Sequence, residues 1–311
     1  KVARDVVDIS PRKDSDSSRK GGRGRIAVVY AEGEIVDGEG EAGEVGGSTF
    51  SRELRKLRQD ENVDAVVLRV NSPGGSASAS EVIQREMRLM KEVKPIVVSM
   101  GTYAASGGYW ISAYADRIFA EPTTITGSIG VFGIQFDVQQ LANRVGITFD
   151  SVKTGKFADT LTVSRPKTEE ELAIFQRMVD WIYGEFVDKV AEGRQLPRDL
   201  VEGIAQGRVW SGSEAQGIGL VDEMGGLDAA IAYAAGQAGL GSNYRLTEFP
   251  RQKDLLEAVQ EFISRVAPRY ARSSGVGASI VERVAAELSV LRSLRDPRGI
   301  YARLPVNLSI R

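Results

Sequence analysis

The sequence contains neither cysteine nor histidine in its 311 residues. Without cysteine there is no disulfide, no thiol nucleophile and no cysteine metal site. Without histidine, the Ser-His-Asp and Cys-His mechanisms and the imidazole metal sites are excluded. Any acid–base chemistry must therefore use a lysine, a carboxylate, a tyrosine or water. We expect neither a metal nor an organic cofactor.

Long apolar runs are also missing. No stretch of 18 apolar residues occurs and the first 25 residues are polar, so we expect neither a membrane-spanning helix nor a signal peptide within this chain. The chain begins at Lys1 rather than at a methionine, which we interpret as the start of a processed or partial chain.

The net charge of −2 is unevenly distributed. Residues 1–24 carry a net +3 and residues 251–311 a net +5, so the body between them carries −10. An acidic body argues against nucleic acid binding. The basic ends are typical of solvated tails, and contact with an anionic membrane surface is the alternative.

Three parts follow one another along the chain. Residues 1–24 are polar and rich in Gly and Ser, which is typical of a linker. Residues 25–240 alternate strand and helix patterns, which predicts an α/β domain with a parallel sheet covered on both faces. Residues 241–311 carry two amphipathic stripes and are predicted to form a helical C-terminal extension. The stripes consist of Leu255, Val259, Phe262 and Val266, and of Val281, Val284, Leu288 and Leu291.

Apolar runs and turn residues predict the elements of the domain. Helices are expected at 48–59, around Ile83, Met87 and Met90, from about 106, at 137–144 and at 168–192, where Thr168 is the N-cap. Two further helices around a short strand close the domain near 240. Strands are expected at 26–36, 64–70, 95–100, 117–120, 128–133 and 147–152.

Two glycine-bearing loops follow two neighbouring strands of this sheet. NSPGGS (71–76) follows the second strand, and GTYAASGG (101–108) follows the third. The carboxyl ends of parallel strands meet at one edge, where working residues gather. Ser106 therefore has the position of a nucleophile, and backbone N–H groups of both loops are placed to form an oxyanion hole. A plain turn at 73–75 and a helix N-cap at Ser106 are the structural alternatives.

Three segments within residues 25–240 stand out together: NSPGGSASASE, YAASGGYWISAYADRIFAEPTTITGSIGVFG and GRVWSGSEAQGIGLVDEMGGLDAA. In these segments the sequence resembles the signal peptide peptidase A (protease IV) family. The resemblance implies a Clp protease/crotonase-like ββα-type fold and a serine endopeptidase with a Ser–Lys dyad. It also implies ring-like or dome-like oligomers, association with a cytoplasmic or thylakoid-type membrane, and cleaved signal peptides or other apolar peptides as substrates.

By this resemblance, individual residues acquire expected roles. Ser106 would be the nucleophile, and Gly75 and Gly107 would supply the oxyanion N–H groups. Ser128 would lie close to the general base. The strand around Ile129 and Gly130 would pair with an extended substrate.

The expected lysine is missing. Alignment of VKTGKFADTLTVSR (152–165) places the base position of single-domain members on Ala158, which cannot accept a proton. Lys153 and Lys156 are nearby but are better interpreted as solvated loop lysines. A serine without its lysine is typical of the C-terminal half of the long two-domain members. The resemblance therefore implies that a missing N-terminal repeat, or a neighbouring subunit, supplies the lysine.

Two other functions are left open by the sequence. A crotonase-like acyl-CoA enzyme would use the same two loops with a glutamate base, for which Glu81 and Glu121 are available. That function leaves Ser106 without a role. A catalytically silent assembly half is the non-enzymatic alternative.

Overall fold

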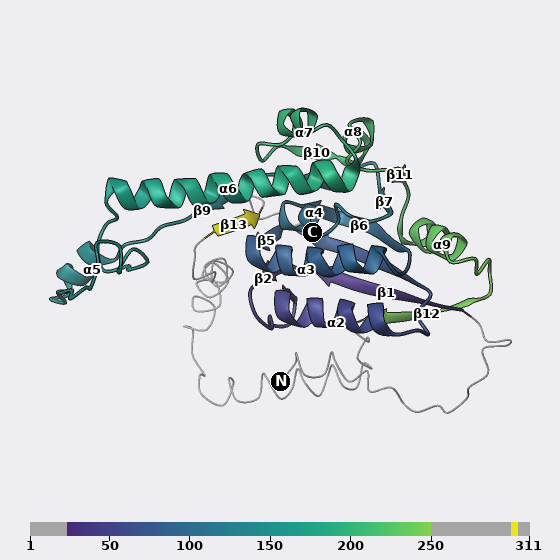
Figure 1. Ribbon diagram of the computed structural model, residues 1–311, viewed down its shortest axis with the longest axis horizontal. Coiled ribbons are helices and arrows are strands. Elements are labelled where there is room, and N and C mark those ends of the chain that lie inside the picture. The colour runs from purple at the N-terminus through teal and green to yellow at the C-terminus, as the bar shows by residue number, and fades with distance from the viewer. Residues whose placement is uncertain (1–23, 250–299, 304–311) are drawn as a thin grey trace, which may run out of the picture.

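The computed structural model describes residues 24–249 and 300–303 (Figure 1). Within these residues, eight strands form one sheet and five strands form a second, smaller sheet. The linker predicted at 1–24, except Gly24, and both stripes of the C-terminal extension lie outside the described residues. No described helix is long and apolar enough to cross a membrane.

The main sheet has a parallel core. Its strands pair in the order β10-β8-β6-β4-β1-β12. Two further strands branch from β6, since β7 pairs with β6 and β11 pairs with β7. Among the described pairs of this sheet, only β10 with β8 is antiparallel. The strands are β1 (Gly24–Glu32), β4 (Ala65–Ser72), β6 (Ile96–Ala105), β7 (Arg117–Ala120), β8 (Ile125–Gly127), β10 (Val209–Ser211), β11 (Glu223–Met224) and β12 (Tyr244–Phe249).

Helices cover both faces of this sheet, as the alternation along β1 requires. Side chains of a strand point alternately to opposite faces. Ala27 and Val29 accordingly belong to the core beneath α2 (Gly47–Gln59) and α3 (Ala77–Lys91). Ile26 and Val28 belong to the core beneath α9 (Leu227–Gln237). The α/β architecture predicted from the sequence is confirmed.

The second sheet joins segments that are far apart in the chain. Its order is β3-β2-β5-β13-β9. β13 lies antiparallel between β5 and β9, although more than 160 residues separate it from both (Figure 1). The strands are β2 (Glu34–Val36), β3 (Glu44–Gly46), β5 (Gly74–Ser76), β9 (Phe132–Gly133) and β13 (Ile300–Arg303).

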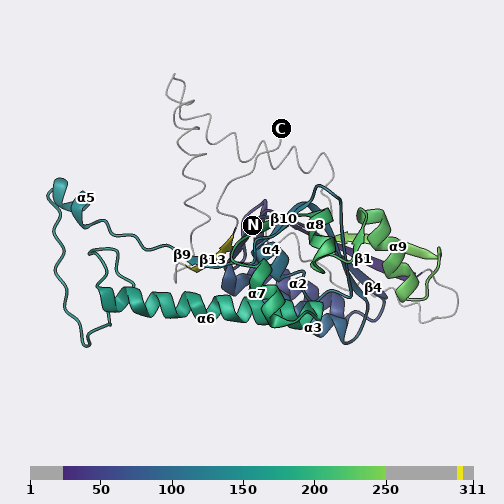
Figure 2. The same ribbon diagram turned by 90° about the horizontal axis from the view of Figure 1, so that it is seen from above.

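The long helix α6 (Glu169–Arg194) connects the body to a projecting arm. Thr168 caps its first turn through a capping box with Glu171, as the TEEE motif predicts. Phe186, Val187 and Val190 near its C-terminal end are buried in the main core. Its N-terminal part extends beyond the sheets together with residues 134–167, which include α5 (Gln139–Arg144) (Figures 1 and 2).

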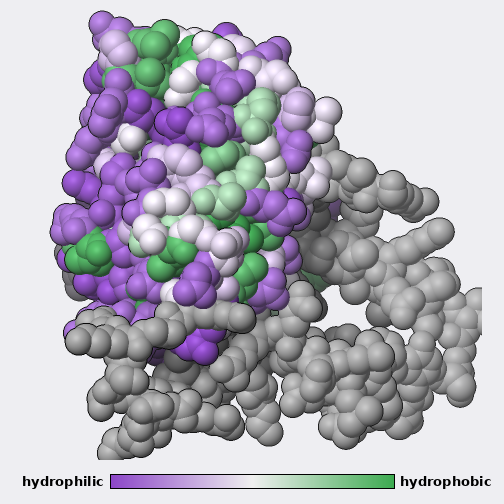
Figure 3. All heavy atoms as spheres, turned by 90° about the vertical axis from the view of Figure 1, so that its right-hand side faces the viewer, coloured by the Kyte–Doolittle hydropathy of each residue, from purple (hydrophilic) through white to green (hydrophobic). Residues whose placement is uncertain are grey.

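The arm, defined here as residues 134–167, exposes many large apolar side chains. They are Phe136, Val138, Leu141, Val145, Ile147, Phe149, Val152, Phe157, Leu161 and Val163. At the opposite end of the molecule, which carries α9, hydrophobic residues lie in small groups among hydrophilic ones (Figure 3). Exposed concentrations of apolar residues are typical of surfaces that contact another protein, a membrane or a ligand.

Several predicted strands differ from the observed ones. The strand expected at 26–36 is broken at Gly33, which has φ 95 and whose added Cβ would lie 1.8 Å from the Gly43 carbonyl oxygen. The strand expected at 128–133 is replaced by β8 and β9, with residues 128–131 between them outside any strand. Residues 147–152 form no strand because they lie in the arm, away from both sheets.

Helical and C-terminal predictions also need correction. The helix expected from about 106 is only α4 (Gly107–Trp110). The apolar spacing of Leu172 and Phe175 within 168–192 predicts one buried helix face, but Leu172 is exposed because that part of α6 projects from the body. Residues 241–311 were expected to form a helical extension, but two described parts of this range are strands. Residues 244–249 form β12, an edge strand of the main sheet, and residues 300–303 form β13 of the second sheet. The remaining helices are α7 (Arg198–Ile204) and α8 (Gly212–Gly217).

Candidate active site

Ser106 occupies the sharp turn between β6 and α4. Its backbone has φ 54 and ψ −116, a combination that residues with a Cβ rarely adopt. The Ser106 N–H donates to the Gly127 carbonyl at 2.8 Å, and the Ser106 carbonyl accepts from the Trp110 N–H at 2.8 Å. Both bonds fix the turn. A non-glycine residue held in such a conformation points to a functional constraint.

The Ser106 side chain does not cap the helix. Although Ser106 stands at the N-cap position of α4, its hydroxyl makes no capping hydrogen bond. Ser106 thus has the N-cap position that the sequence predicts, but without a side-chain capping hydrogen bond. Its Oγ instead donates a long hydrogen bond of 3.5 Å to the Gly130 carbonyl, and the residue has no exposed surface.

The two glycine-bearing segments lie against each other, as the sequence predicts, but they are largely strand: residues 101–105 continue β6 and residues 74–76 form β5. The Tyr103 N–H donates to Asn71 Oδ1 at 3.4 Å. A Cβ on Gly108 would lie 2.7 Å from the Ser72 carbonyl oxygen, so only glycine lets α4 approach the 71–76 loop this closely. Ser72 Oγ accepts from the Gly74 N–H at 3.2 Å and holds the start of that loop.

The predicted oxyanion residues lie in these two loops. Gly75 has φ 154, and an added Cβ would lie 1.9 Å from the Ile35 carbonyl oxygen, so the position requires glycine. Gly107 is the first residue of α4, and the first N–H groups of a helix have no partner within it. Their role as donors to an oxyanion stays a prediction.

The segment Ser128–Gly130 runs along the loop before β10. Ser128 is buried with φ 49, and its N–H donates to the Arg208 carbonyl at 2.7 Å. The Ile129 carbonyl accepts from the Gly207 N–H at 2.9 Å. Gly130 then presents its carbonyl to Ser106 Oγ. The structure brings Gly130 into contact with Ser106, while the predicted roles of Ser128 and Ile129 stay untested.

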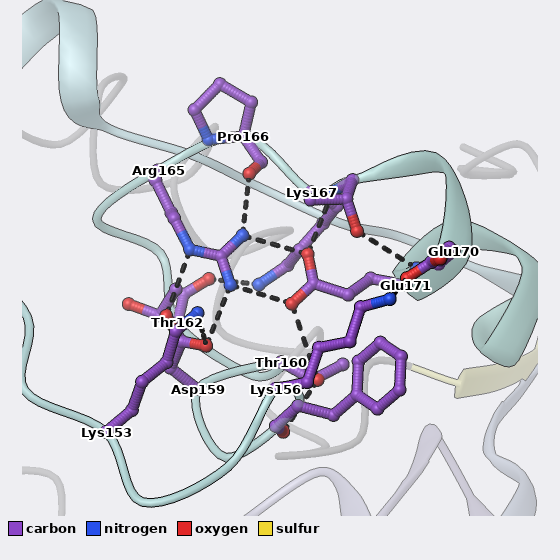
Figure 4. A network of polar contacts seen from close by, with 12 residues as sticks. Lys153, Lys156, Asp159, Thr160, Thr162, Arg165, Pro166, Lys167, Glu170 and Glu171 are labelled. Carbon is purple, nitrogen blue, oxygen red and sulfur yellow. Dashed lines mark hydrogen bonds and ion pairs between the residues drawn. The ribbon is translucent and has the colours of Figure 1, made fainter.

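The segment 152–165, in which the general base was expected, lies in the arm, and its two lysines form ion pairs (Figure 4). Lys153 Nζ lies 2.9 Å from Asp159 Oδ1, and Lys156 pairs with Glu170. Ala158 is exposed. Lys153 and Lys156 therefore fit the interpretation as loop lysines with carboxylate partners.

A cluster around Arg165 was not predicted from the sequence. Arg165 Nη2 lies 2.8 Å from Asp159 Oδ1 and 2.7 Å from Glu171 Oε1 (Figure 4). The hydrogen bond from Arg165, followed by that from the Thr168 N–H, lowers the pKa of Glu171 to about 2. The hydrogen bonds from Arg165 and then Lys153 hold the pKa of Asp159 well below its usual range. This cluster ties the end of the arm to the first turn of α6.

Behind the serine, α4 packs on α6. Trp110 stacks on Phe186 with ring centroids 4.3 Å apart, and its Nε1 donates to Glu81 Oε2 at 3.1 Å. Glu81, one of the two carboxylates that a crotonase-like enzyme could use, is thus engaged by Trp110. The other, Glu121, is exposed. The described residues contain no group of three or more Asp, Glu, His or Cys side chains that could hold a metal ion.

Residues 88–241 match the family model "Peptidase family S49". Over 90% of its length the chain is 40% identical to "Protease 4" of Salmonella typhi, and over 91% it is 35% identical to "Serine protease SPPA, chloroplastic" of Arabidopsis thaliana. It covers 46% and 41% of these two relatives, so it spans less than half of each.

A shorter relative is covered over about three quarters of its length. A putative protease of Synechocystis sp. is 36% identical over 70% of this chain, and the match covers 76% of that relative. Among solved structures, a ClpP1 mutant from Listeria monocytogenes aligns with a TM-score of 0.45 and 18% identity, covering 66% of this chain and 94% of that one.

Proposed function

The chain belongs to peptidase family S49, and from that premise we propose that it is a serine endopeptidase with Ser106 as its nucleophile. The observation that carries the proposal is the backbone of Ser106, which is held at φ 54 and ψ −116 on the turn between β6 and α4. Glycine would adopt this conformation without strain. A serine retained here indicates that its hydroxyl is needed.

The chemistry follows from the groups around this turn. Ser106 Oγ attacks the carbonyl carbon of the scissile peptide, a base takes the Oγ proton, and negative charge develops on the carbonyl oxygen. The N–H groups of Gly75 and Gly107 are the donors that we assign to that oxygen. The proton is then given to the leaving amine, and water hydrolyses the resulting ester.

The base that we propose is a lysine from a second S49 repeat. Histidine is absent from the whole chain, and a lysine in a partly desolvated site has its pKa lowered toward neutrality. Within this chain the aligned position is Ala158, and Lys153 and Lys156 have carboxylate partners in the arm. The relatives named "Protease 4" and "SPPA" are more than twice as long as the matched segment, which leaves room for such a repeat.

The arm is the surface that we assign to this second repeat. It carries the aligned base position and the exposed apolar side chains, and it projects from the body beside the second sheet (Figure 2). A repeat that packs on the arm would bury those apolar side chains and could bring its lysine toward Ser106. A lysine-bearing repeat, on the same polypeptide or in a neighbouring subunit, fits this role, whereas a second copy of this chain would again present Ala158.

Substrates bind as extended strands in our proposal. An extended peptide that took the place of β13 would pair with β5 and β9 on either side, and main-chain pairing accepts many side chains. Apolar peptides such as cleaved signal peptides are the substrate class that the family membership favours. We further propose that the enzyme works at a membrane surface, supported by the net +5 of residues 251–311. Flotation with anionic vesicles should decrease when these residues are removed, and unchanged flotation would refute this.

The nucleophile is tested by labelling with a fluorophosphonate and by casein hydrolysis. The chain co-assembled with a lysine-bearing repeat should be active, and Ser106→Ala should abolish labelling and hydrolysis. Ser213→Ala is the matched control, since Ser213 is exposed on α8 and its loss should change neither. Undiminished activity of Ser106→Ala would refute the assignment.

The source of the base is tested by restoring the lysine. Ala158→Lys should raise the activity of the isolated chain when it self-assembles, whereas Lys153→Ala and Lys156→Ala should leave activity unchanged. A folded, oligomeric Ala158→Lys variant without any gain would show that Ala158 is not the base position. A loss of activity in Lys153→Ala would place the base within this chain.

A further inference from the structure

The helix that follows the proposed nucleophile is too short to hold its own position. α4 has only four residues, Gly107–Trp110, and two of them are glycines without side chains. An isolated helix of this length is not stable, so tertiary contacts must fix α4. These contacts matter for Ser106, because its carbonyl accepts from the Trp110 N–H at 2.8 Å. The position of Trp110 therefore sets one side of the serine turn.

Two aromatic side chains anchor α4, and each makes a hydrogen bond through its polar atom. Tyr109 is fully buried, and its hydroxyl donates to the Leu220 carbonyl at 2.8 Å. Trp110 is 3% exposed, stacks on Phe186 and donates from Nε1 to Glu81 Oε2 at 3.1 Å. A buried indole N–H needs an acceptor. Glu81 supplies that acceptor from a side chain, so a substitution can remove it.

Lys189 holds the Glu81 carboxylate in place. Glu81 lies on α3, and 44% of its side chain is exposed, so the carboxylate could otherwise turn toward water. Lys189 of α6 places its Nζ 3.7 Å from Glu81 Oε1 and 2.8 Å from Glu185 Oε2. An ion pair at one carboxylate oxygen leaves the other oxygen to accept from the indole. Glu81 is thus held between α6 and α4.

We propose that Glu81 is a positioning residue for Ser106: it holds the Trp110 indole, and through the Trp110 main chain it holds the turn that carries the nucleophile. The proposal rests on the function proposed above. Glu81 acts on the distance and angle at which Ser106 Oγ meets the scissile carbonyl carbon, and small displacements there slow the chemical step. In the ground state the peptide pairs with strands rather than with α4, so KM should not change.

A double-mutant cycle on Glu81 and Trp110 tests the proposal in the full chain co-assembled with a lysine-bearing repeat. Glu81→Ala removes the acceptor, and Glu81→Gln keeps an acceptor oxygen. Trp110→Phe removes the N–H and keeps an aromatic ring against Phe186. Glu92→Ala is the matched control, because Glu92 is an exposed glutamate at the C-terminal end of α3. Two substitutions that break the same hydrogen bond are not additive.

The first measurement is the hydrolysis of a fluorogenic apolar peptide. Glu81→Ala should lower kcat about tenfold and leave KM within about twofold of the native value. Glu81→Gln should keep kcat within about twofold of the native value, because its amide oxygen accepts from the indole. In the Trp110→Phe background, Glu81→Ala should lower kcat no further. Glu92→Ala should change neither constant.

The second measurement does not depend on catalysis. The chain contains three tryptophans, and the indole signal of Trp110 in an NMR spectrum is the one that Trp110→Phe removes. Exchange of this indole N–H with solvent should accelerate in Glu81→Ala, and it should stay at the native rate in Glu81→Gln and Glu92→Ala. Ser106→Ala should give the same exchange as the native chain, since the indole bond does not involve the hydroxyl.

Three outcomes would overturn the proposal. Unchanged indole exchange in Glu81→Ala would mean that Glu81 does not hold Trp110. Faster exchange with unchanged kcat would mean that this hydrogen bond does not position the serine. A further loss of kcat on adding Glu81→Ala to Trp110→Phe would mean that Glu81 acts by another route. Full activity of Ser106→Ala would refute the function proposed above, and it is recognised separately because the indole exchange does not report on the nucleophile.

Discussion

Replacement of Ser106 by glycine should stabilise the protein while it removes the proposed nucleophile. The native backbone at Ser106, φ 54 and ψ −116, is strained for any residue with a Cβ. Such strain costs about 1–3 kcal/mol. Glycine adopts the conformation without strain but loses about 0.4–1 kcal/mol through the greater freedom of the unfolded chain.

The net expectation is a gain of up to about 2.6 kcal/mol in the free energy of unfolding, with a mid-range value of about 1.3 kcal/mol. For a domain of this size, 1 kcal/mol shifts Tm by about 2–4 °C, so the mid-range gain should raise Tm by about 3–5 °C. The lost hydroxyl contributes little, since its hydrogen bond to Gly130 is 3.5 Å long. Ser106→Ala keeps the Cβ and therefore the strain, and isolates the effect of the hydroxyl.

The assay is thermal and urea unfolding of Ser106→Gly and Ser106→Ala, with Ser213→Gly and Ser213→Ala as the control pair. Ser213 lies on the exposed side of α8, where glycine should be less stable than alanine by up to about 1 kcal/mol. The order of glycine and alanine should thus be opposite at the two positions. If Ser106→Gly is no more stable than Ser106→Ala, the turn stores no strain and the argument from it fails.

Two further predictions concern the support of the site. Phe186→Ala should lower the free energy of unfolding by about 3–5 kcal/mol, because Phe186 is fully buried against Trp110. The control Trp181→Ala, on the exposed side of α6, should change it by about 0.5 kcal/mol or less. Equal effects of the two substitutions in urea unfolding would contradict this packing. The hydrogen bond from Arg165 lowers the pKa of Glu171 to about 2 in the folded protein. The Glu171 carboxylate therefore stabilises the folded state above the ordinary glutamate pKa, and this stabilisation is lost as the pH falls through the pKa of the folded state. Stability measured from pH 6 to 2 should therefore decrease less steeply in Arg165→Ala than in the native chain or in the exposed control Arg177→Ala, and identical slopes in all three would refute the role of Arg165.

The elements that form the main core could be predicted from the sequence. The pattern of apolar residues in these elements depends only on which face of each element is buried. Examples are the apolar runs at 65–70 and 96–100 and the spacing of Ile83, Met87 and Met90. Glycine-rich turns can also be predicted from local sequence. The glycines at 74–75 and 107–108 predict that two chain segments meet at one edge of the parallel sheet, and this contact is confirmed.

The parts that sequence patterns missed depend on distant partners. β13 is four residues long, and its pairing with β5 and β9 bridges more than 160 residues, so no local pattern reveals it. The segment 147–152 has strand composition, but it lies in the arm, where none of the strands among residues 24–249 and 300–303 pairs with it. The contacts of Arg165 with Asp159 and Glu171 require the loop to fold back on α6, which charge alone does not indicate.

The helix α6 connects the arm to the residues that pack behind the serine. Its fixed end is Phe186, which stacks on Trp110 only four residues after Ser106. From Phe186 to Glu169 the helix extends about 26 Å at 1.5 Å per residue. A tilt of about 5° at the fixed end therefore moves the arm by about 2 Å over that length. The packing of one aromatic pair behind the serine thus sets where the arm lies relative to the serine, and a mutation at that pair should displace the arm and disturb the site together.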